Sequence, residues 1–364
     1  MAAVRLVLAA VGLLALAGWG SSGPGVQTLY RSSHRTIAAF AQDGQLIAWL
    51  SAGTGACNAV HVLSLRGVEV TLPKPGTNNV TCRWTMGSAP VDLVVASDTG
   101  SALWTLHERT AVELDYVVGA DVSQPRERRF SQLAHTRAGA GLWLGGIAGE
   151  GKTLVYSFTT VGYVNQVACL SGGSCRRRIV GGGVRRIVGR HNPLVPGTEA
   201  ALGIATAGGR IAYTPAAAVS STGRPVASDS LPIDVLDAVT GALVSQAQPD
   251  GEPLAVALSA NRLVVLERSN GKLHVCWYDL ATGDQLGTVR VPQHTSAELT
   301  TSDHMAAYHV GRTIDGVDLD SGREQVLARA ATTPIGLSLV GTRLAWAENV
   351  KGTGRIRALI VGSS

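Results

Sequence analysis

The segment Gln42-Asp43-Gly44-Gln45-Leu46-Ile47-Ala48-Trp49 decides the fold, because its pattern returns along the whole chain. In each copy a polar or glycine-containing turn precedes an apolar residue, then Ala or Val, and often an aromatic residue. After the copy at Ala48, the others are centred on Val94, Val155, Ala212, Val264, Ala307 and Ala345. The intervals are 46, 61, 57, 52, 43 and 38 residues, which indicates one repeat-built domain rather than the two domains that 364 residues would allow.

The repeating unit contains several short strands. Each apolar run is bounded by turn residues, as expected of a strand buried on both faces. In the clearest unit, residues 262–267 form this strand, residues 273–280 alternate like a second strand, and residues 285–291 form an outer strand. The second strand leads into a D-x-x-[TS]-G motif, which we interpret as a hairpin turn made by an Asp side chain and a glycine at positive φ. This motif occupies residues 237–241, 279–283 and 318–322.

Seven copies of a unit of about 50 residues predict an all-β fold, a seven-bladed β-propeller that spans residues 26–364. Six or eight blades are alternatives, and a pair of β-sandwiches is the alternative fold. The last copy has only three strands before the chain ends, whereas residues 26–32 resemble a strand without a unit. We therefore expect this N-terminal strand to close the last blade as its outermost strand, which removes an exposed sheet edge.

The first copy resembles the S-P-D-G-x-x-[IL]-A-[FWY] repeat of TolB-type propellers, although it lacks Ser-Pro and later copies lose Asp-Gly. Nearly the whole mature chain is similar to the TolB-type, WD40-like and quinoprotein-like β-propellers of exported bacterial proteins. Residues 97–104 resemble the Asp box of sialidase propellers, which in those families is a structural hairpin turn. The resemblance implies a scaffold whose loops at the blade ends hold a partner.

Residues 1–17 have the pattern of a signal peptide. A short basic start ends at Arg5, residues 6–17 are apolar, and Ala15-Leu16-Ala17 is a small-x-small cleavage site. The apolar run is short for a membrane span, and no other stretch is longer, so we expect no transmembrane helix after signal removal. A buried N-terminal helix is the alternative interpretation.

We interpret residues 18–25 as a flexible tether that follows the cleavage site. The sequence Leu16-Ala17-Gly18 resembles a lipoprotein box, but Trp19 stands where the lipid-bearing cysteine would be. Because an indole has no nucleophilic sulfur, lipidation at this residue is chemically impossible. We therefore expect an exported monomer that is secreted, periplasmic or associated with the cell wall.

Export makes disulfides permissible, and the chain contains five cysteines. Cys169 and Cys175 flank a short loop that a disulfide could close. Cys57 and Cys82 are the second candidate pair, which would join an early hairpin to the segment entering the next blade. Cys276 is left over and is expected to be buried. The spacing gives neither a C-x-x-C redox motif nor a zinc site, and we expect no metal and no cofactor.

Composition argues against two classes of protein, and positive charge is concentrated in one basic segment. The 45% hydrophobic content argues against disorder, and 16% charged residues with 44 glycines argue against a coiled coil. The net charge is +5, and six arginines lie within 15 residues without one acid. We interpret them as a candidate site for an anionic surface, such as a cell-wall polymer or lipid headgroups; a solvated loop is the alternative. They are Arg176, Arg177, Arg178, Arg185, Arg186 and Arg190.

Nucleic acid is not expected as a partner, because the protein is predicted to be exported and the arginine segment lacks interleaved aromatic residues. Two other irregular segments, residues 124–129 and 220–231, are expected to be surface loops or hairpins. Insertions of this kind in a repeat scaffold often lie on one face and carry binding.

No motif of a known chemistry is present, because the chain lacks a G-x-S-x-G elbow, H-E-x-x-H, a Walker loop and an EF-hand. The closest grouping with histidines, Asp303, His304 and His309, is interpreted as a turn and a strand end. We therefore expect a non-enzymatic propeller that binds a protein or a cell-envelope ligand. The alternatives are a hydrolase, lyase or glycosidase with its active site at the mouth of the central channel, and a structural module without a ligand. Converging carboxylates, His and Arg at that mouth would favour the enzyme; Ala, Ser and Thr would disfavour it.

Overall fold

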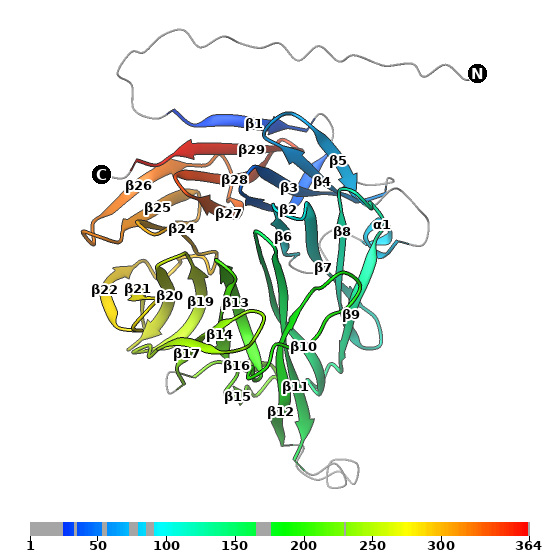
Figure 1. The fold of residues 1–364 in the computed structure, drawn as a ribbon, viewed down its shortest axis with the longest axis vertical. Coiled ribbons are helices and arrows are strands. Elements are labelled where there is room, and N and C mark those ends of the chain that lie inside the picture. The colour runs from blue at the N-terminus through cyan, green and yellow to red at the C-terminus, as the bar shows by residue number, and fades with distance from the viewer. Residues whose placement is uncertain are drawn as a thin grey trace.

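The computed structural model describes residues 25–32, 35–52, 57–72, 79–84, 91–164, 176–228 and 231–362. Within these ranges the chain forms strands and one short helix, α1 (Val80–Arg83), and none of its helices could span a bilayer. The sheets surround a common centre, and the β11–β12 hairpin extends beyond them (Figure 1). The predicted all-β class is therefore confirmed. The predicted signal peptide, the tether up to residue 24 and the Cys169–Cys175 pair lie outside the described residues.

Five four-stranded sheets are present in the described chain, and all their strand pairs are antiparallel. From the inner edge outward, their strands are β2 (Thr36–Asp43), β3 (Leu46–Ala52), β4 (Ala59–Ser64) and β5 (Glu69–Leu72); β13 (Ala201–Ala207), β14 (Arg210–Pro215), β17 (Ile233–Asp237) and β18 (Leu243–Ala247); β19 (Glu252–Leu258), β20 (Arg262–Ser269), β21 (Lys272–Asp279) and β22 (Gln285–Val291); β23 (Thr300–Thr301), β24 (Met305–Val310), β25 (Thr313–Asp318) and β26 (Glu324–Arg329); and β27 (Ile335–Val340), β28 (Arg343–Val350), β29 (Thr353–Ile360) and β1 (Gln27–Arg31). A small hairpin of β15 (Ala218–Val219) and β16 (Pro225–Val226) is inserted between β14 and β17.

One larger sheet of seven strands stands where two further four-stranded blades were expected, so the described residues form five separate four-stranded blades and not the predicted seven. Its strands β9 and β10 are joined by a single pair, Gly141 with His135. In the tight turn between them the Thr136 N–H donates to the Ala140 carbonyl at 2.8 Å, so the two strands leave the turn side by side. The strands are β6 (Leu93–Ala96), β7 (Ser101–Arg109), β8 (Glu113–Asp121), β9 (Arg128–His135), β10 (Gly141–Glu150), β11 (Thr153–Tyr163) and β12 (Arg177–Arg186).

The inner-edge strands of the five four-stranded sheets, together with β6 and β10 of the larger sheet, surround the centre of the molecule. Contacts run from β2 to β6, and then to β10, β13, β19, β23 and β27, and β27 contacts β2 again. Apolar clusters fill the space between neighbouring sheets. A closed ring of sheets around a channel is a β-propeller.

The recurring sequence pattern marks a second strand, in which the aromatic position is buried. At this position stand residues that are each no more than 2% exposed, namely Trp49, Trp104, Tyr156, Tyr213, Tyr308 and Trp346. One expected position is wrong, because Val94 lies in the inner strand β6 and the equivalent residue is Leu103 in β7. Both strands are short apolar runs next to turns, so the residue pattern does not separate them.

The N-terminal strand closes the last sheet as predicted. β1 pairs antiparallel with β29, and Gln27 lies opposite Ala358 and Arg31 opposite Arg355. The Asn349 side chain then joins this sheet to β2: its Oδ1 accepts from the Ile37 N–H at 2.8 Å, and its Nδ2 donates to the Ile37 carbonyl at 2.9 Å. The two ends of the described chain are therefore tied to each other.

The three D-x-x-[TS]-G motifs form the predicted Asp-based turns. Oδ1 of Asp237 accepts hydrogen bonds from the Val239 and Thr240 N–H groups and from the Thr240 hydroxyl. Asp279 and Asp318 accept the equivalent three bonds. Hydrogen bonds from backbone N–H groups hold the pKa of Asp237 and of Asp279 below the usual value. The motif glycines lie at positive φ of 71°, 80° and 71°, at Gly241, Gly283 and Gly322.

Removal of the closing strand should destabilise the ring. Deletion of residues 26–33 leaves β29 with an unpaired edge and uncovers Trp49, whose ring lies 4.1 Å from that of Tyr30. We expect Tm by calorimetry to fall by on the order of 5–10 °C. Deletion of residues 18–25 alone is the control and should leave Tm unchanged; equal melting temperatures for the two deletions would contradict the closure.

Candidate functional site

One mouth of the central channel holds a cavity of about 390 Å³. Residues of every inner strand, or directly beside it, contribute to its wall, from β2 round to β27. Apart from aliphatic residues, most of the lining side chains are small or carry a hydroxyl. They are Ala148, Ala205, Thr206, Ala257, Ser259, Ala260, Thr300, Thr301, Ser302 and Ser338.

The acids of this cavity are used in contacts between neighbouring units. Oδ2 of Asp43 accepts hydrogen bonds from the N–H groups of Ser97 and Gly151, both at 2.7 Å. Ser97 follows β6 and Gly151 follows β10, so one carboxylate, at the end of β2, connects three inner strands. Glu150, at the end of β10, accepts from the Gly208 N–H at 2.7 Å in the turn after β13.

A third acid repeats the arrangement on the opposite part of the ring. Asp303, between β23 and β24, accepts from the Asn261 N–H at 2.9 Å and from its side-chain amide at 3.2 Å. Asn261 lies in the turn between β19 and β20. The predicted grouping of Asp303, His304 and His309 is therefore a turn and a strand end: His304 pairs with exposed Asp320 at 2.8 Å, and His309 is buried on β24.

Arginines at one position of the repeat also make contacts between units, in which their side chains are the donors. Arg210, Arg262 and Arg343 each begin the second strand of a unit. Arg343 donates to the Gln42 side chain at 2.9 Å and to the Gly44 carbonyl at 2.6 Å, which joins the last unit to the first. Arg210 donates to the Ala260 carbonyl of the following unit at 3.1 Å. The signal for these contacts was visible in the sequence as an Arg two residues before the pattern centre in three copies.

Glu150 is the one lining acid with a raised pKa. Burial raises the pKa of Glu150, the charges of Asp43 and Asp98 raise it further, and the hydrogen bond from Gly208 opposes the change. A perturbed acid in a cavity is a catalytic candidate, but acid–base chemistry on a glycoside requires a second carboxyl group free to act. Asp43, the other acid on this side, already holds two N–H groups.

The six arginines predicted as one anionic-surface site do not form a single cluster. Arg176 precedes β12, and Arg177 and Arg178 lie at its start, where Arg177 is opposite Tyr163. Arg185 and Arg186 lie at the other end of β12, where Arg186 is opposite Val155. Arg178 and Arg185 are seven positions apart along the strand, which rises roughly 3.3 Å per residue. The extended strand therefore places these arginines in two groups, one at each end of β12.

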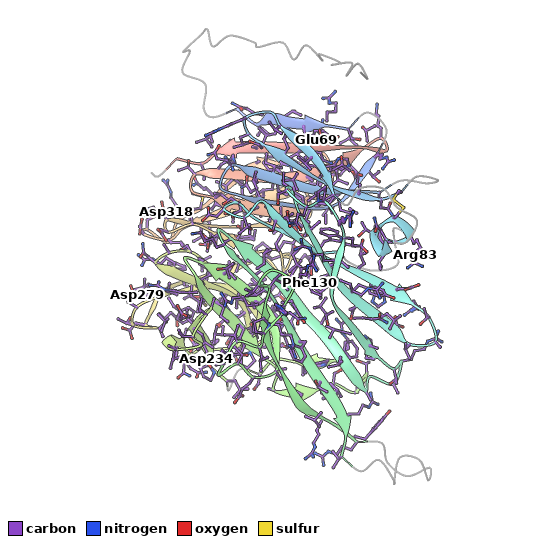
Figure 2. The ribbon with its side chains drawn as sticks, turned by 45° about the vertical axis from the view of Figure 1, so that its right-hand side comes forward. Glu69, Arg83, Phe130, Asp234, Asp279 and Asp318 are labelled. Carbon is purple, nitrogen blue, oxygen red and sulfur yellow. A yellow bond between two sulfur atoms is a disulfide. The ribbon has the colours of Figure 1, made fainter. Side chains whose placement is uncertain are left out.

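Arg190 instead joins a second arginine-rich segment. A hollow of about 700 Å³ is lined by Arg190 together with residues 123–130, and it is called the arginine hollow below. Its guanidinium groups belong to Arg126, Arg128, Arg129 and Arg190. The Asn192 side chain donates to the Phe130 carbonyl of β9 at 2.7 Å and to the Tyr156 hydroxyl at 3.0 Å, which holds the segment after β12 against β9 (Figure 2 labels Phe130).

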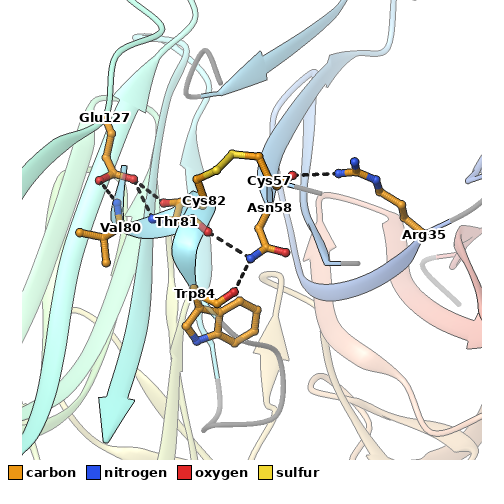
Figure 3. The surroundings of a disulfide bond; sticks show 8 residues. All are labelled: Arg35, Cys57, Asn58, Val80, Thr81, Cys82, Trp84 and Glu127. Atoms are coloured by element: carbon orange, nitrogen blue, oxygen red, sulfur yellow. Dashed lines mark hydrogen bonds between the residues drawn. A yellow bond between two sulfur atoms is a disulfide. The ribbon is translucent and has the colours of Figure 1, made fainter. Parts of the chain in front are cut away.

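The acid within this segment is turned toward α1. Glu127 Oε1 accepts from the Val80 N–H at 2.8 Å, and Oε2 accepts from the Thr81 N–H at 3.0 Å and from its hydroxyl at 2.6 Å (Figure 3). Both carboxylate oxygens are thus occupied by the start of the helix. This contact was not predicted, because Glu127 and α1 are far apart in sequence.

The predicted disulfide between Cys57 and Cys82 is present and holds α1 in place, with an S–S distance of 2.02 Å. It joins Cys57, two residues before β4, to the helix, and Asn58 donates to the Thr81 and Trp84 carbonyls beside it (Figure 3). Cys276 is buried as expected, and burial raises the pKa of its thiol to about 12.

No family model and no curated protein matches the chain. Among solved structures, the β-propeller domain of the Trilobed protease from Pyrococcus furiosus aligns with a TM-score of 0.52 and 9% identity, over 90% of this chain and 96% of that one. KlHsv2 with loop 6CD replaced by a Gly-Ser linker aligns with a TM-score of 0.50 and 8% identity, over 87% and 94% of the two chains. At such identities the likeness shows the fold alone. The chain is similar to β-propellers, and no particular family is indicated.

Asp43→Ala should destabilise the protein. The change leaves the N–H groups of Ser97 and Gly151 without their acceptor, at an expected cost of about 2 kcal/mol. Asp303→Ala is the matched control: its partner Asn261 is exposed, so water replaces the carboxylate and the cost should stay below about 1 kcal/mol. Urea unfolding measures both values, and equal costs would contradict the assignment of Asp43 as a contact between units.

Proposed function

We propose that the protein is an exported, non-enzymatic β-propeller that binds a protein or a cell-envelope polymer. The observation that carries this proposal is how the side chains that line the channel mouth are bonded. Its acids accept hydrogen bonds from turns of neighbouring units, and its remaining lining is aliphatic, small or hydroxylic. A site organised in this way stabilises a ring and lacks a free acid–base pair.

We also propose that the ring has seven blades. The inner strands β2, β6, β10, β13, β19, β23 and β27 support this count, because each contacts the next. In this interpretation the larger sheet is two blades, β6–β9 and β10–β12, joined through the single pair of Gly141 and His135. The TolB-type repeat pattern remains the proposed relationship of the chain.

Export is supported by the sequence of residues 1–17 and by the Cys57–Cys82 disulfide, since such bonds persist in oxidising compartments. The proposed mature protein is a monomer that begins with the tether at residue 18. It carries no lipid at Trp19, for the chemical reason given above.

The alternative function is an enzyme that acts at the channel mouth, and the raised pKa of Glu150 is the observation in its favour. A hydrolase or lyase of this kind would use Glu150 as its acid. Glu150→Gln would then abolish turnover while leaving binding to the envelope intact.

Expression with the native leader in a bacterial host tests export. The exported protein should have the intact mass of residues 18–364 without lipid and with Cys57 and Cys82 oxidised, because the signal peptide ends at Ala17. Mass spectrometry under non-reducing conditions measures this. A retained leader or an added lipid mass would contradict the proposal.

Binding is tested by co-sedimentation of the mature protein with the envelope fraction of the cells that produce it. We expect saturable binding and no release of soluble products from the fraction. Protease treatment of the fraction removes a protein partner and leaves a polymer partner. Failure to bind would contradict the proposal, and release of products that is lost in Glu150→Gln would establish the enzyme instead.

A further inference from the structure

We propose that the arginine hollow is a binding site for an anionic polymer, a chain with a phosphate or carboxylate on its repeating units. This inference rests on the proposed function and names the chemistry of its ligand. It follows from three features of the hollow, which are the pairing of its charges, the way its walls are held and its shape.

The charges of the hollow are only partly compensated. Glu127, the acid in the wall, accepts three hydrogen bonds from Val80 and Thr81 and is directed away from the arginines. Arg128 lies 3.5 Å from Asp121 and donates to Gln124 at 2.6 Å. Arg126 and Arg190 are exposed and form no ion pair with any described residue. The hollow therefore presents a positive field that the protein itself does not neutralise.

The backbone on both sides of the hollow is held in place. Arg190 lies in a tight turn, in which Val188 and His191 exchange N–H to carbonyl bonds, both at 2.9 Å. On the other side, the Arg126 N–H donates to the Gln124 carbonyl at 2.7 Å. Arg129 lies over the Tyr116 ring at 5.1 Å from its centroid. A guanidinium group that is held before binding, as that of Arg129 is, loses less entropy when it binds an anion.

The shape and exposure favour a chain over a single ion. The volume of about 700 Å³ exceeds what one small anion fills. Exposed guanidinium groups bind single anions weakly in water, but several of them acting on one polyanion release its condensed counterions together. The hollow is concave, so a chain can enter it, whereas a flat bilayer surface meets only its rim.

The contribution of these residues is tested with the mature protein, residues 18–364, and its variant Arg126→Glu/Arg190→Glu. Arg290→Glu/Arg312→Glu is the matched control, because it changes the net charge equally at two exposed arginines, one in β22 and one in the turn between β24 and β25. The probes are inorganic polyphosphate, polygalacturonate and neutral dextran, and vesicles of phosphatidylcholine with phosphatidylglycerol. Binding is measured by titration at several salt concentrations, and folding is checked by Tm.

We expect the wild type to bind one or both anionic polymers and not dextran. The hollow variant should bind about tenfold more weakly. Its plot of log K against log salt should also be shallower, with the magnitude of the slope smaller by roughly 0.7 for each lost contact. The control should keep the wild-type slope. Polyphosphate and polygalacturonate together distinguish a phosphate-bearing from a carboxylate-bearing polymer.

Equal losses in the hollow variant and in the control would overturn the inference, because net charge alone would then explain binding. Binding to anionic vesicles without binding to either polymer would also overturn it and would identify a membrane surface. Failure of this inference differs from failure of the proposed function: envelope binding that persists in the hollow variant overturns the inference alone, whereas a wild type that binds polyphosphate but no envelope overturns the function alone.

Discussion

Carboxylates at the channel mouth hold the ring together by accepting hydrogen bonds from turns of neighbouring sheets. Turns that crowd around a common axis are partly shielded from water, and their N–H groups need acceptors. Asp43 serves two of these turns and Glu150 a third. Catalysis needs acids that can exchange protons with a substrate. These contacts between neighbouring sheets are the basis of the proposed non-enzymatic function.

Ring closure sets the positions of these contacts and of the outer loops. The pairing of β1 with β29, together with Asn349 and Arg343, fixes the last sheet against the first. Outside the ring, the Cys57–Cys82 disulfide positions α1, and α1 in turn holds Glu127. A covalent bond thus helps to keep the carboxylate of Glu127 bound to α1 and directed away from the arginines, which links the expected oxidising compartment to the electrostatics of the proposed site.

Local sequence patterns predicted the features that depend on neighbouring residues. The Asp-based turns at Asp237, Asp279 and Asp318 follow from a five-residue motif, and the closing strand follows from counting strands in the last unit. Where two strands look alike the prediction was wrong: Val94 belongs to β6, not to β7. The merged sheet was missed for a related reason, because a single backbone pair between β9 and β10 leaves no residue pattern.

The candidate site was predicted less well, because it depends on distant residues. Arg190 was included in the predicted arginine segment, but Arg126 was interpreted only as part of a loop, and the fold brings both to one hollow. Clustering in sequence suggested clustering in space, which holds for a loop but not for an extended strand such as β12. The neutralising contacts of Glu127 depend on α1, which no local pattern connects with it.

The most direct test of the structural role of the channel acids is amide hydrogen exchange of Ser97 and Gly151, measured by NMR on the folded protein. Both N–H groups donate to Asp43 at 2.7 Å. The account predicts slow exchange for both, comparable with amides paired within the sheets. Exchange as fast as that of exposed turn amides would mean that Asp43 is free, and it would favour the alternative proposal of an enzyme at the channel mouth.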